Sequence, residues 1–213
     1  MTILFDLDGT LLDTGPDFLI TLNQMLTQDS LPTIPYAAIR PYINLGTSKM
    51  LEIAYGQTAT EAMRKRFLAI YLELNLANTK LFPGVMQMLV QLHANYRLGL
   101  VTNKSTKLTL LALHKFAIHK FFSAIVCGDT LAVKKPDPAP LLLAAQQLRV
   151  APEKCIFIGD AQTDIIAGKS AKMRTILATF GYVPQDSNTL ASWHADSLSN
   201  NTQQLLETIT LWS

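Results

Sequence analysis

The stretch ILFDLDGTLLDT, residues 3–14, decides the fold that we predict for this chain. Three apolar residues lead into Asp6 and, one residue later, into Asp8, and Gly9 follows at once. Runs of Ile, Leu and Phe normally exclude carboxylates, because burying an unpaired charge is costly. Two carboxylates at the end of such a run therefore need something that offsets their charge.

The spacing of the two aspartates suits the carboxyl end of a strand. Alternate residues of a strand point to the same side, so Asp6 and Asp8 share one side, and Gly9 permits a sharp turn. A turn with two exposed aspartates is one alternative. A calcium loop is excluded, because its glycine at Gly9 would put Leu4 at the first ligand position. A hard divalent cation with oxygen ligands would offset the repulsion between the carboxylates.

The composition is that of a globular chain. The 213 residues are 49% hydrophobic and 16% charged, enough for one sizeable core or a core with a smaller insertion. The net charge of +2 is small and scattered, which predicts no nucleic-acid surface. No apolar run reaches the roughly 18 residues of a membrane span, and we expect neither a membrane segment nor a signal peptide. Cys127 and Cys155 lie in apolar stretches and are expected to be free thiols of a cytoplasmic protein.

Strand and helix patterns alternate from about residue 82 onward. Short apolar or β-branched runs predict strands at residues 2–5, 98–102, 124–127, 155–158 and 175–178. Helical spacing of apolar residues predicts helices near 85–92, 108–115 and 141–148. This alternation predicts an α/β fold, a Rossmann-like doubly wound parallel sheet covered by helices on both faces.

Residues 15–81 do not follow that alternation. Apolar spacing predicts helices near 18–26 and 63–74 and a short helix near 50–54, separated by prolines and glycines. We therefore predict a helical cap domain at 15–81, inserted into a core domain made of 1–14 and 82–213.

Polar residues follow the later strands as well. Thr102 and Asn103 end one strand, Lys135 lies in KKPDP, and Asp160 and Asp164 lie in GDAQTDI. Open α/β sheets bind ligands beyond the carboxyl ends of their strands, so we expect these side chains to converge there. Asn103 has an alternative role as the cap of the following helix.

These motifs, in this order, resemble the haloacid dehalogenase-like phosphohydrolase superfamily, and the match includes the helical insertion after the first motif. The resemblance implies that Asp6 is the nucleophile, which takes the phosphoryl group as an aspartyl-phosphate. It implies that Asp8 is the general acid and base, with its backbone carbonyl facing the metal. A carboxylate nucleophile divides hydrolysis into transfer to the enzyme and release by water, and a neighbouring acid and base serves both halves.

The other motif residues take supporting roles in this resemblance. Thr102 resembles the hydroxyl that holds a phosphate oxygen, Asn103 lies beside the phosphate, and Lys135 resembles the cation of the third motif. The implied cofactor is Mg²⁺, with Asp6, Asp8 and Asp160 as its ligands and Asp164 as a supporting carboxylate. Mg²⁺ and a lysine offset the charge of a phosphoryl group during transfer.

Substrate choice is the least constrained expectation. Arg40 lies beside a proline in the predicted cap, where its guanidinium group could bind a substrate carboxylate through two hydrogen bonds. An exposed arginine without a role in binding is an equally weighted alternative. The closing segment FGYVPQDSNTLASWHADSL, with Trp193 and Asp196, resembles phosphatases acting on phosphoglycolate and on N-acetylmuramic acid 6-phosphate. Trp193 is alternatively a core aromatic.

We therefore expect a phosphatase of a small phosphorylated metabolite, a monomer or weak homodimer, with phosphoglycolate as the leading substrate. The alternatives are N-acetylmuramic acid 6-phosphate or another sugar phosphate, a phosphomutase, and a non-catalytic phosphate-binding regulator. Dehalogenation is disfavoured, because the predicted site is built for a metal.

Overall fold

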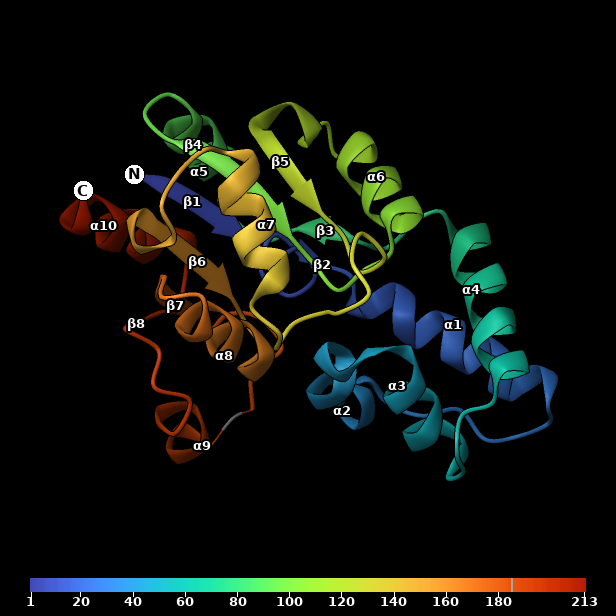
Figure 1. Ribbon diagram of the computed structural model, residues 1–213. Helices are drawn as coiled ribbons and strands as arrows, with labels where there is room; N and C mark the ends of the chain where they lie inside the picture. Colours follow the sequence, from blue (N-terminus) through green and yellow to red (C-terminus); the bar gives the residue numbers. More distant parts are fainter. Residues whose placement is uncertain (185) are drawn as a thin grey trace. The chain divides into compact units, whose positions relative to one another are not determined.

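The computed structural model describes residues 1–184 and 186–213 (Figure 1), so that Gln185 of the closing segment lies outside the described residues. The chain forms two compact units, one of residues 1–12 with 81–213 and one of residues 13–80. The assignment of 15–81 as a cap domain and of the remainder as the core domain stays a prediction.

A six-stranded sheet forms the centre of the larger unit. Its strands are all parallel and lie in the order β5-β4-β1-β6-β7-β8. Their bounds are β1 Thr2–Phe5, β4 Arg97–Val101, β5 Phe122–Val126, β6 Cys155–Gly159, β7 Arg174–Ala178 and β8 Ser197–Ser199. The predicted parallel α/β sheet is confirmed, and the edge strand β8 adds one strand to the five predicted.

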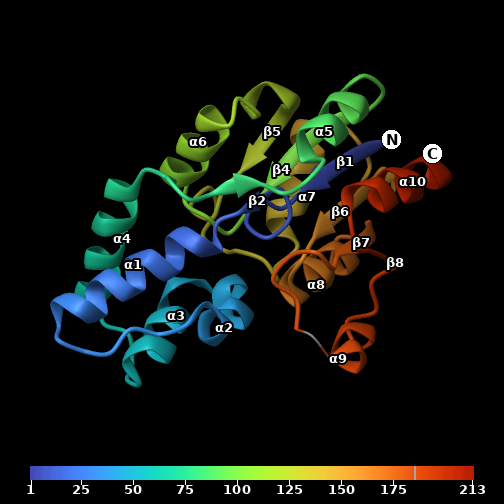
Figure 2. The ribbon, with the colours of Figure 1, turned by 180° about the vertical axis from the view of Figure 1, so that it is seen from behind.

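Helices cover both faces of this sheet. Figure 1 looks onto the face covered by α7 (Ala139–Gln147) and α8 (Gln162–Ser170). Figure 2 shows the opposite face, covered by α5 (Val85–His93) and α10 (Thr202–Trp212). The remaining helical segments of this unit are α6 Thr106–Lys115, η2 His119–Phe121, η3 Pro152–Lys154 and α9 Ser187–Ala191.

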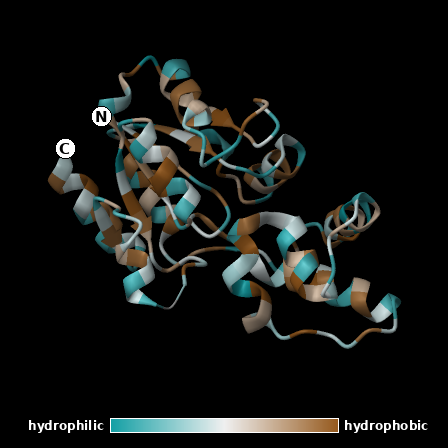
Figure 3. Ribbon diagram, turned by 60° about the horizontal axis from the view of Figure 1, so that its bottom comes forward, coloured by the Kyte–Doolittle hydropathy of each residue, from teal (hydrophilic) through white to brown (hydrophobic). Residues whose placement is uncertain are grey.

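Burial on both faces explains the composition of the strands. Ile3, Leu4 and Phe5 of β1 are completely buried, as are Ile156, Phe157 and Ile158 of β6. Strands buried on both faces consist of continuous apolar residues, which is the pattern that the sequence shows. In Figure 3 the strands are largely hydrophobic, whereas the helices alternate between hydrophobic and hydrophilic turns.

The smaller unit is helical. It contains α1 Gly15–Gln28, α2 Tyr36–Ile39, η1 Arg40–Leu45, α3 Gly46–Tyr55 and α4 Glu61–Leu74. The rings of Phe18 and Tyr71 stack with centroids 5.0 Å apart, and those of Phe67 and Tyr71 lie 6.0 Å apart. The pair of Phe18 and Tyr71 joins α1 to α4, whereas the pair of Phe67 and Tyr71 lies within α4.

The two ends of this helical unit are joined by one buried carboxylate. Asp17, completely buried in α1, accepts hydrogen bonds from the main-chain N–H groups of Asn78 and Thr79 and from both of their side chains. A two-stranded sheet of β2 (Leu12–Asp13) and β3 (Lys80–Leu81) lies where the chain passes from one unit to the other. Among the described residues, no helix combines the length and the apolar character needed to cross a membrane.

Candidate active site

The site lies at the carboxyl ends of the three central strands. Phe5 of β1 is in register with Leu100 of β4 and with Ile158 of β6. Asp6, Thr102 and Asp160, which follow these strands, therefore come to the same edge of the sheet. The chain runs outward from β1 first through β4 and β5 and then through β6, β7 and β8. Such a reversal of strand order is where doubly wound sheets bind their ligands.

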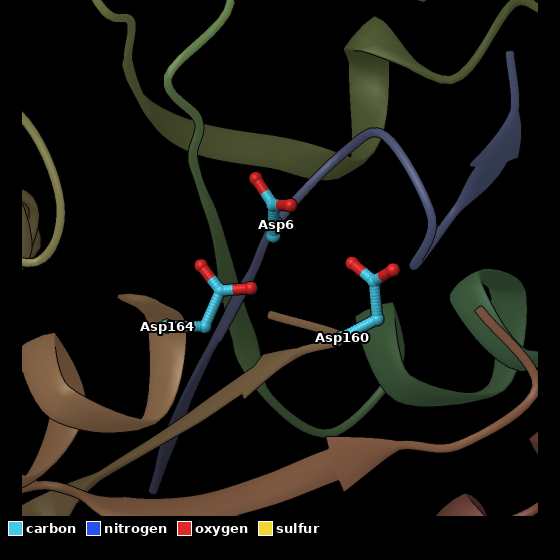
Figure 4. Close-up of side chains that lie close together, drawn as sticks. All are labelled: Asp6, Asp160 and Asp164. Atoms are coloured by element: carbon cyan, nitrogen blue, oxygen red, sulfur yellow. The ribbon is translucent and has the colours of Figure 1, made fainter. Parts of the chain in front are cut away.

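Three buried carboxylates meet at this edge. Asp6, Asp160 and Asp164 each offer an oxygen, and these oxygens lie within 4.8 Å of one another. Figure 4 shows Asp6 on the loop after β1, Asp160 at the end of β6 and Asp164 in the first turn of α8. The carboxylate of Asp8, a predicted metal ligand through its backbone carbonyl, is outside this group among the described residues.

Asp160 is held in place from several directions. Its Oδ2 accepts a hydrogen bond from the main-chain N–H of Tyr182 at 2.7 Å, and its Oδ1 contacts the hydroxyl of Thr10 at 3.4 Å. Two glycines make room for it: a Cβ on Gly9 would lie 2.0 Å from Oδ2, and a Cβ on Gly181 would lie 2.6 Å from the same atom. The Asp160 carboxylate is completely buried, and these contacts fix its position.

Lys135, the predicted cation, is buried among the acidic groups. Its Nζ lies 2.7 Å from Oδ1 of Asp6 and 2.7 Å from Oδ1 of Asp164, and it donates to the carbonyl of Val101 at 2.9 Å. Burying a charged ammonium group is costly unless opposite charges pair with it. The structure therefore brings Lys135 together with two of the predicted acidic residues.

The oxygens of Asp164 and Asp6 differ in what they contact. Oδ2 of Asp164 accepts from the N–H of Ala161 at 3.0 Å, and its Oδ1 pairs with Lys135. For Asp6, Lys135 contacts Oδ1, and no hydrogen-bond donor among the described residues reaches Oδ2. This geometry suits Asp164 to support its neighbours and leaves Asp6 an oxygen with which to react.

The charges at the site are not balanced by the protein alone. Lys135 pairs with Asp6 and Asp164, two of the three carboxylates that cluster here, and so brings one positive charge to a group of three acids. Burial raises the pKa of Asp6 to about 7, against the opposing effect of Lys135, and the charge of Asp164 adds to the rise. Burial lowers the pKa of Lys135, but Asp164 and Asp6 outweigh it and raise this pKa to about 12. A set of hard oxygen donors with excess negative charge fits a divalent cation such as Mg²⁺.

Thr102 and Asn103 follow β4 at the same edge. The hydroxyl oxygen of buried Thr102 accepts from the N–H of Lys104 at 3.2 Å, and its own proton has no acceptor among the described residues. The side chain of Asn103 bonds to the main chain of Lys135, donating to its carbonyl and accepting from its N–H, both at 3.0 Å. Ser105, and not Asn103, takes the N-cap position of α6.

Sequence reasoning missed Lys104. Its Nζ lies 3.0 Å from Oδ1 and 3.2 Å from Oδ2 of Asp8, so that the predicted acid and base has a lysine of its own. The only signal in the sequence is its place directly after Thr102 and Asn103.

The other predicted residues lie elsewhere. Arg40 is half-buried at the start of η1, within the helical unit. Trp193 packs against the core cluster of Ile165, Leu177 and Val183, as in its alternative interpretation. Asp196 forms an ion pair with Lys169 and accepts hydrogen bonds from the N–H and hydroxyl of Thr175.

Comparison with known proteins identifies the family of the chain. The model of the haloacid dehalogenase-like hydrolase family matches residues 3–178 of the chain. The chain belongs to this family. The predicted superfamily and the assignment as a hydrolase are thereby confirmed.

Individual relatives of the hydrolase match over nearly the whole chain. A phosphoglycolate phosphatase of Xanthomonas campestris pv. campestris (strain 8004) is 41% identical over 96% of this chain and 94% of its own length. An N-acetylmuramic acid 6-phosphate phosphatase of Pseudomonas putida (strain KT2440) is 32% identical over 97% of this chain and 95% of its own.

Solved structures share the fold. A phosphoglycolate phosphatase predicted in Haemophilus somnus 129pt superposes with a TM-score of 0.86 at 29% identity, covering 98% of this chain and 97% of that one. A hydrolase from Pseudomonas syringae superposes with a TM-score of 0.76 at 23% identity, covering 98% and 97% of the two chains, which shows a common fold.

Proposed function

We propose that this hydrolase is a Mg²⁺-dependent phosphatase that acts on a small phosphomonoester, with phosphoglycolate as its leading substrate. The observation that carries the proposal is the pairing of Asp6 with Lys135 beside Asp160 and Asp164, at the carboxyl end of the central strand. A buried carboxylate beside a buried cation suits attack on a phosphoryl group, whose charge must be offset as it is transferred.

In this proposal Asp6 attacks the phosphorus atom and becomes an aspartyl-phosphate. Lys135 anchors Oδ1 of Asp6 and faces the equatorial phosphoryl oxygens, and the Thr102 hydroxyl donates to one of them. Asn103 keeps Lys135 in place through its main chain and lies beside the phosphate. Each of these residues positions charge, which is most of what catalysis of phosphoryl transfer requires.

Asp8 acts as the general acid and the general base. It protonates the oxygen of the leaving alcohol in the first half and takes a proton from the attacking water in the second. Asp6 and Asp160, with the backbone carbonyl of Asp8, would hold Mg²⁺, and Asp164 would support them. When bound, the ion supplies positive charge to the phosphoryl oxygens.

The substrate is proposed from the relatives and from the predicted role of Arg40. Phosphoglycolate phosphatases reach 41% identity and N-acetylmuramic acid 6-phosphate phosphatases 32%, so phosphoglycolate is preferred and the sugar acid is the second candidate. Both molecules carry a carboxylate, to which an arginine such as Arg40 can bind. Two buried free thiols, Cys127 and Cys155, agree with a cytoplasmic enzyme.

The test is a comparison of kcat/KM for phosphate release from phosphoglycolate, N-acetylmuramic acid 6-phosphate and hexose phosphates, with Mg²⁺ and with a chelator. We expect the highest value for phosphoglycolate and loss of turnover on chelation. Asp6→Asn should keep less than about a hundredth of the wild-type rate, because an amide is a poor nucleophile. Glu153→Gln, an exposed acid-to-amide change before β6, is the control and should keep full activity.

Turnover by Asp6→Asn near the wild-type rate would overturn the nucleophilic role. Transfer of the phosphoryl group to a second position of a sugar, without release of phosphate, would identify a mutase instead.

A further inference from the structure

The proposed acid and base, Asp8, is bound by a lysine distinct from the one that binds the nucleophile. Lys104 Nζ contacts both carboxylate oxygens of Asp8, at 3.0 and 3.2 Å. The side chain of Lys104 is 5% exposed and that of Asp8 is 19% exposed. Exposed ion pairs contribute little, but a lysine buried to this degree is held where it is by its partner.

The backbone of Lys104 is also fixed. Its N–H donates to the hydroxyl of Thr102 at 3.2 Å, and its carbonyl accepts from the N–H of Gly128 at 2.8 Å. A Cβ on Gly128 would lie 2.0 Å from the carbonyl oxygen of Asn103, so the loops after β4 and β5 are in close contact at this point. The ammonium group of Lys104 thus extends to Asp8 from a rigid frame, and not from a mobile surface loop.

We infer that Lys104 is a positioning residue, which holds the Asp8 carboxylate in the orientation from which it accepts a proton from water. The inference rests on the proposed role of Asp8 as acid and base. In the geometry observed, both oxygens of Asp8 act as acceptors toward the lysine. A carboxylate oxygen has further lone pairs with which to accept from water.

The step concerned is the second half of the reaction. The oxygen of water bonds to phosphorus while the bond between phosphorus and the Asp6 oxygen breaks. One proton of the water passes to Asp8, and inorganic phosphate and free Asp6 are released. A base held at a fixed distance and angle accelerates such a step, because little orientational freedom is then lost on reaching the transition state.

The first half depends less on this contact when the leaving group is good. Nitrophenolate leaves without needing a proton, so transfer from p-nitrophenyl phosphate to Asp6 proceeds without Asp8 as an acid. The two halves can therefore be separated, because kcat/KM reports the transfer step and kcat also contains the release by water.

Stopped-flow measurement with p-nitrophenyl phosphate and Mg²⁺ tests the inference. For Lys104→Met we expect kcat to fall roughly tenfold or more, within the range that proton transfer contributes. We expect kcat/KM to stay within about twofold of wild type, a burst of nitrophenolate, and acid-stable phosphate on the protein. Lys104→Arg, which keeps the charge, should restore most of kcat, and Lys107→Met, an exposed lysine of α6, should behave as wild type.

An equal fall of kcat and kcat/KM without a burst, or no change in either, would overturn the inference. Asp8→Asn in the same assay separates this failure from failure of the proposed function. If Asp8→Asn accumulates phosphoenzyme and Lys104→Met does not, only the role of Lys104 is wrong. If Asp8→Asn accumulates none, the assignment of Asp8 as the base is wrong. Thermal unfolding checks that the variants fold. If Lys104→Met does not fold, Lys104→Gln replaces it, and we again expect kcat to fall while kcat/KM stays near the wild-type value.

Discussion

Asn103 holds the main chain of Lys135 by two reciprocal hydrogen bonds, although 32 residues separate them. The amide nitrogen donates to the Lys135 carbonyl and the amide oxygen accepts from the Lys135 N–H, both at 3.0 Å. The side chain of the same lysine reaches Asp6 and Asp164. The loop after β4 therefore sets the position of the cation that is carried by the loop after β5.

Replacing Asn103 should weaken both the fold and the anion site. Asn103→Ala loses two hydrogen bonds, so we expect the free energy of unfolding to fall by about 2 kcal/mol. Displacement of Lys135 should also weaken competitive inhibition by inorganic phosphate several-fold. Urea unfolding and the inhibition constant measure the two effects. Asn95→Ala is the control, at an exposed asparagine whose side chain makes a 3.5 Å contact to the Gln91 carbonyl. Unchanged stability of Asn103→Ala would contradict the role of this pair.

Gly181 should tolerate no side chain. Its Cβ would lie 2.1 Å from the carbonyl oxygen of Gly9 and 2.6 Å from Oδ2 of Asp160, so Gly181→Ala must displace one of them. We expect weaker Mg²⁺ binding, measured by calorimetric titration, together with a loss of stability. Gly56→Ala is the control, because no atom of the described residues lies within 4 Å of the Cβ it would add, although its positive φ of 65° disfavours a side chain. Equal Mg²⁺ affinity in both variants would show that Asp160 is not displaced.

Mg²⁺ should stabilise the folded protein through Asp160. Binding to the folded state alone adds about 2.7 kcal/mol at a hundredfold excess of the ion over its Kd. We expect thermal unfolding of wild type to shift upward by several degrees with Mg²⁺. Asp160→Ala should show a much smaller shift and need more Mg²⁺ for half-maximal activity. Glu153→Gln should shift as wild type does. A full shift in Asp160→Ala would remove this residue from the ion's ligands.

The metal-free protein should lose stability as the pH rises. Burial raises the pKa of Asp6 from its ordinary 3.8 to about 7, so the folded state binds a proton that the unfolded chain releases. The contribution is complete below pH 4 and is lost as the pH passes 7. In a chelator, we expect the free energy of unfolding of wild type, relative to Asp6→Asn, to fall between pH 5 and pH 8 by on the order of a few kcal/mol. Parallel pH profiles for the two proteins would contradict this.

The sequence predicted the central sheet because its strands are buried on both faces and therefore consist of unbroken apolar runs. The edge strand Ser197–Ser199 has no such run. It is a strand because it pairs with β7, with Ile176 opposite Ser197 and Ala178 opposite Ser199. The hydrophobic pattern of a short segment does not predict a strand that forms because it pairs with a neighbouring strand.

The residues of the candidate site that could be predicted from the sequence are those that follow a strand or belong to a family motif. Asp6, Lys135 and Asp160 follow buried strands or lie in recognisable motifs, and the structure brings them to one edge of the sheet. Lys104 was missed because its partner, Asp8, is 96 residues away and no spacing within one loop reveals where a lysine side chain ends. The bond from Asn103 to Lys135 is equally non-local.

Arg40 gives the sharpest test of substrate choice. If it binds a substrate carboxylate, Arg40→Ala should lower kcat/KM for phosphoglycolate far more than for ethyl phosphate, which has the same two-carbon leaving group without the carboxylate. A lost bidentate charge pair costs on the order of 2 kcal/mol, roughly a thirtyfold fall. Arg40→Lys should recover only part of it, because an ammonium group does not reproduce the planar fork of arginine.

The same helical unit offers a matched control for that comparison. Arg64 of α4 forms an exposed ion pair with Glu61 at 2.8 Å, and Arg64→Ala should leave both kcat/KM values unchanged. An equal fall on both substrates in Arg40→Ala would mean that Arg40 supports the structure of its own unit, where it starts η1. No fall on either substrate would make it a surface arginine, and the preference for carboxylate-bearing substrates would then have to come from other residues.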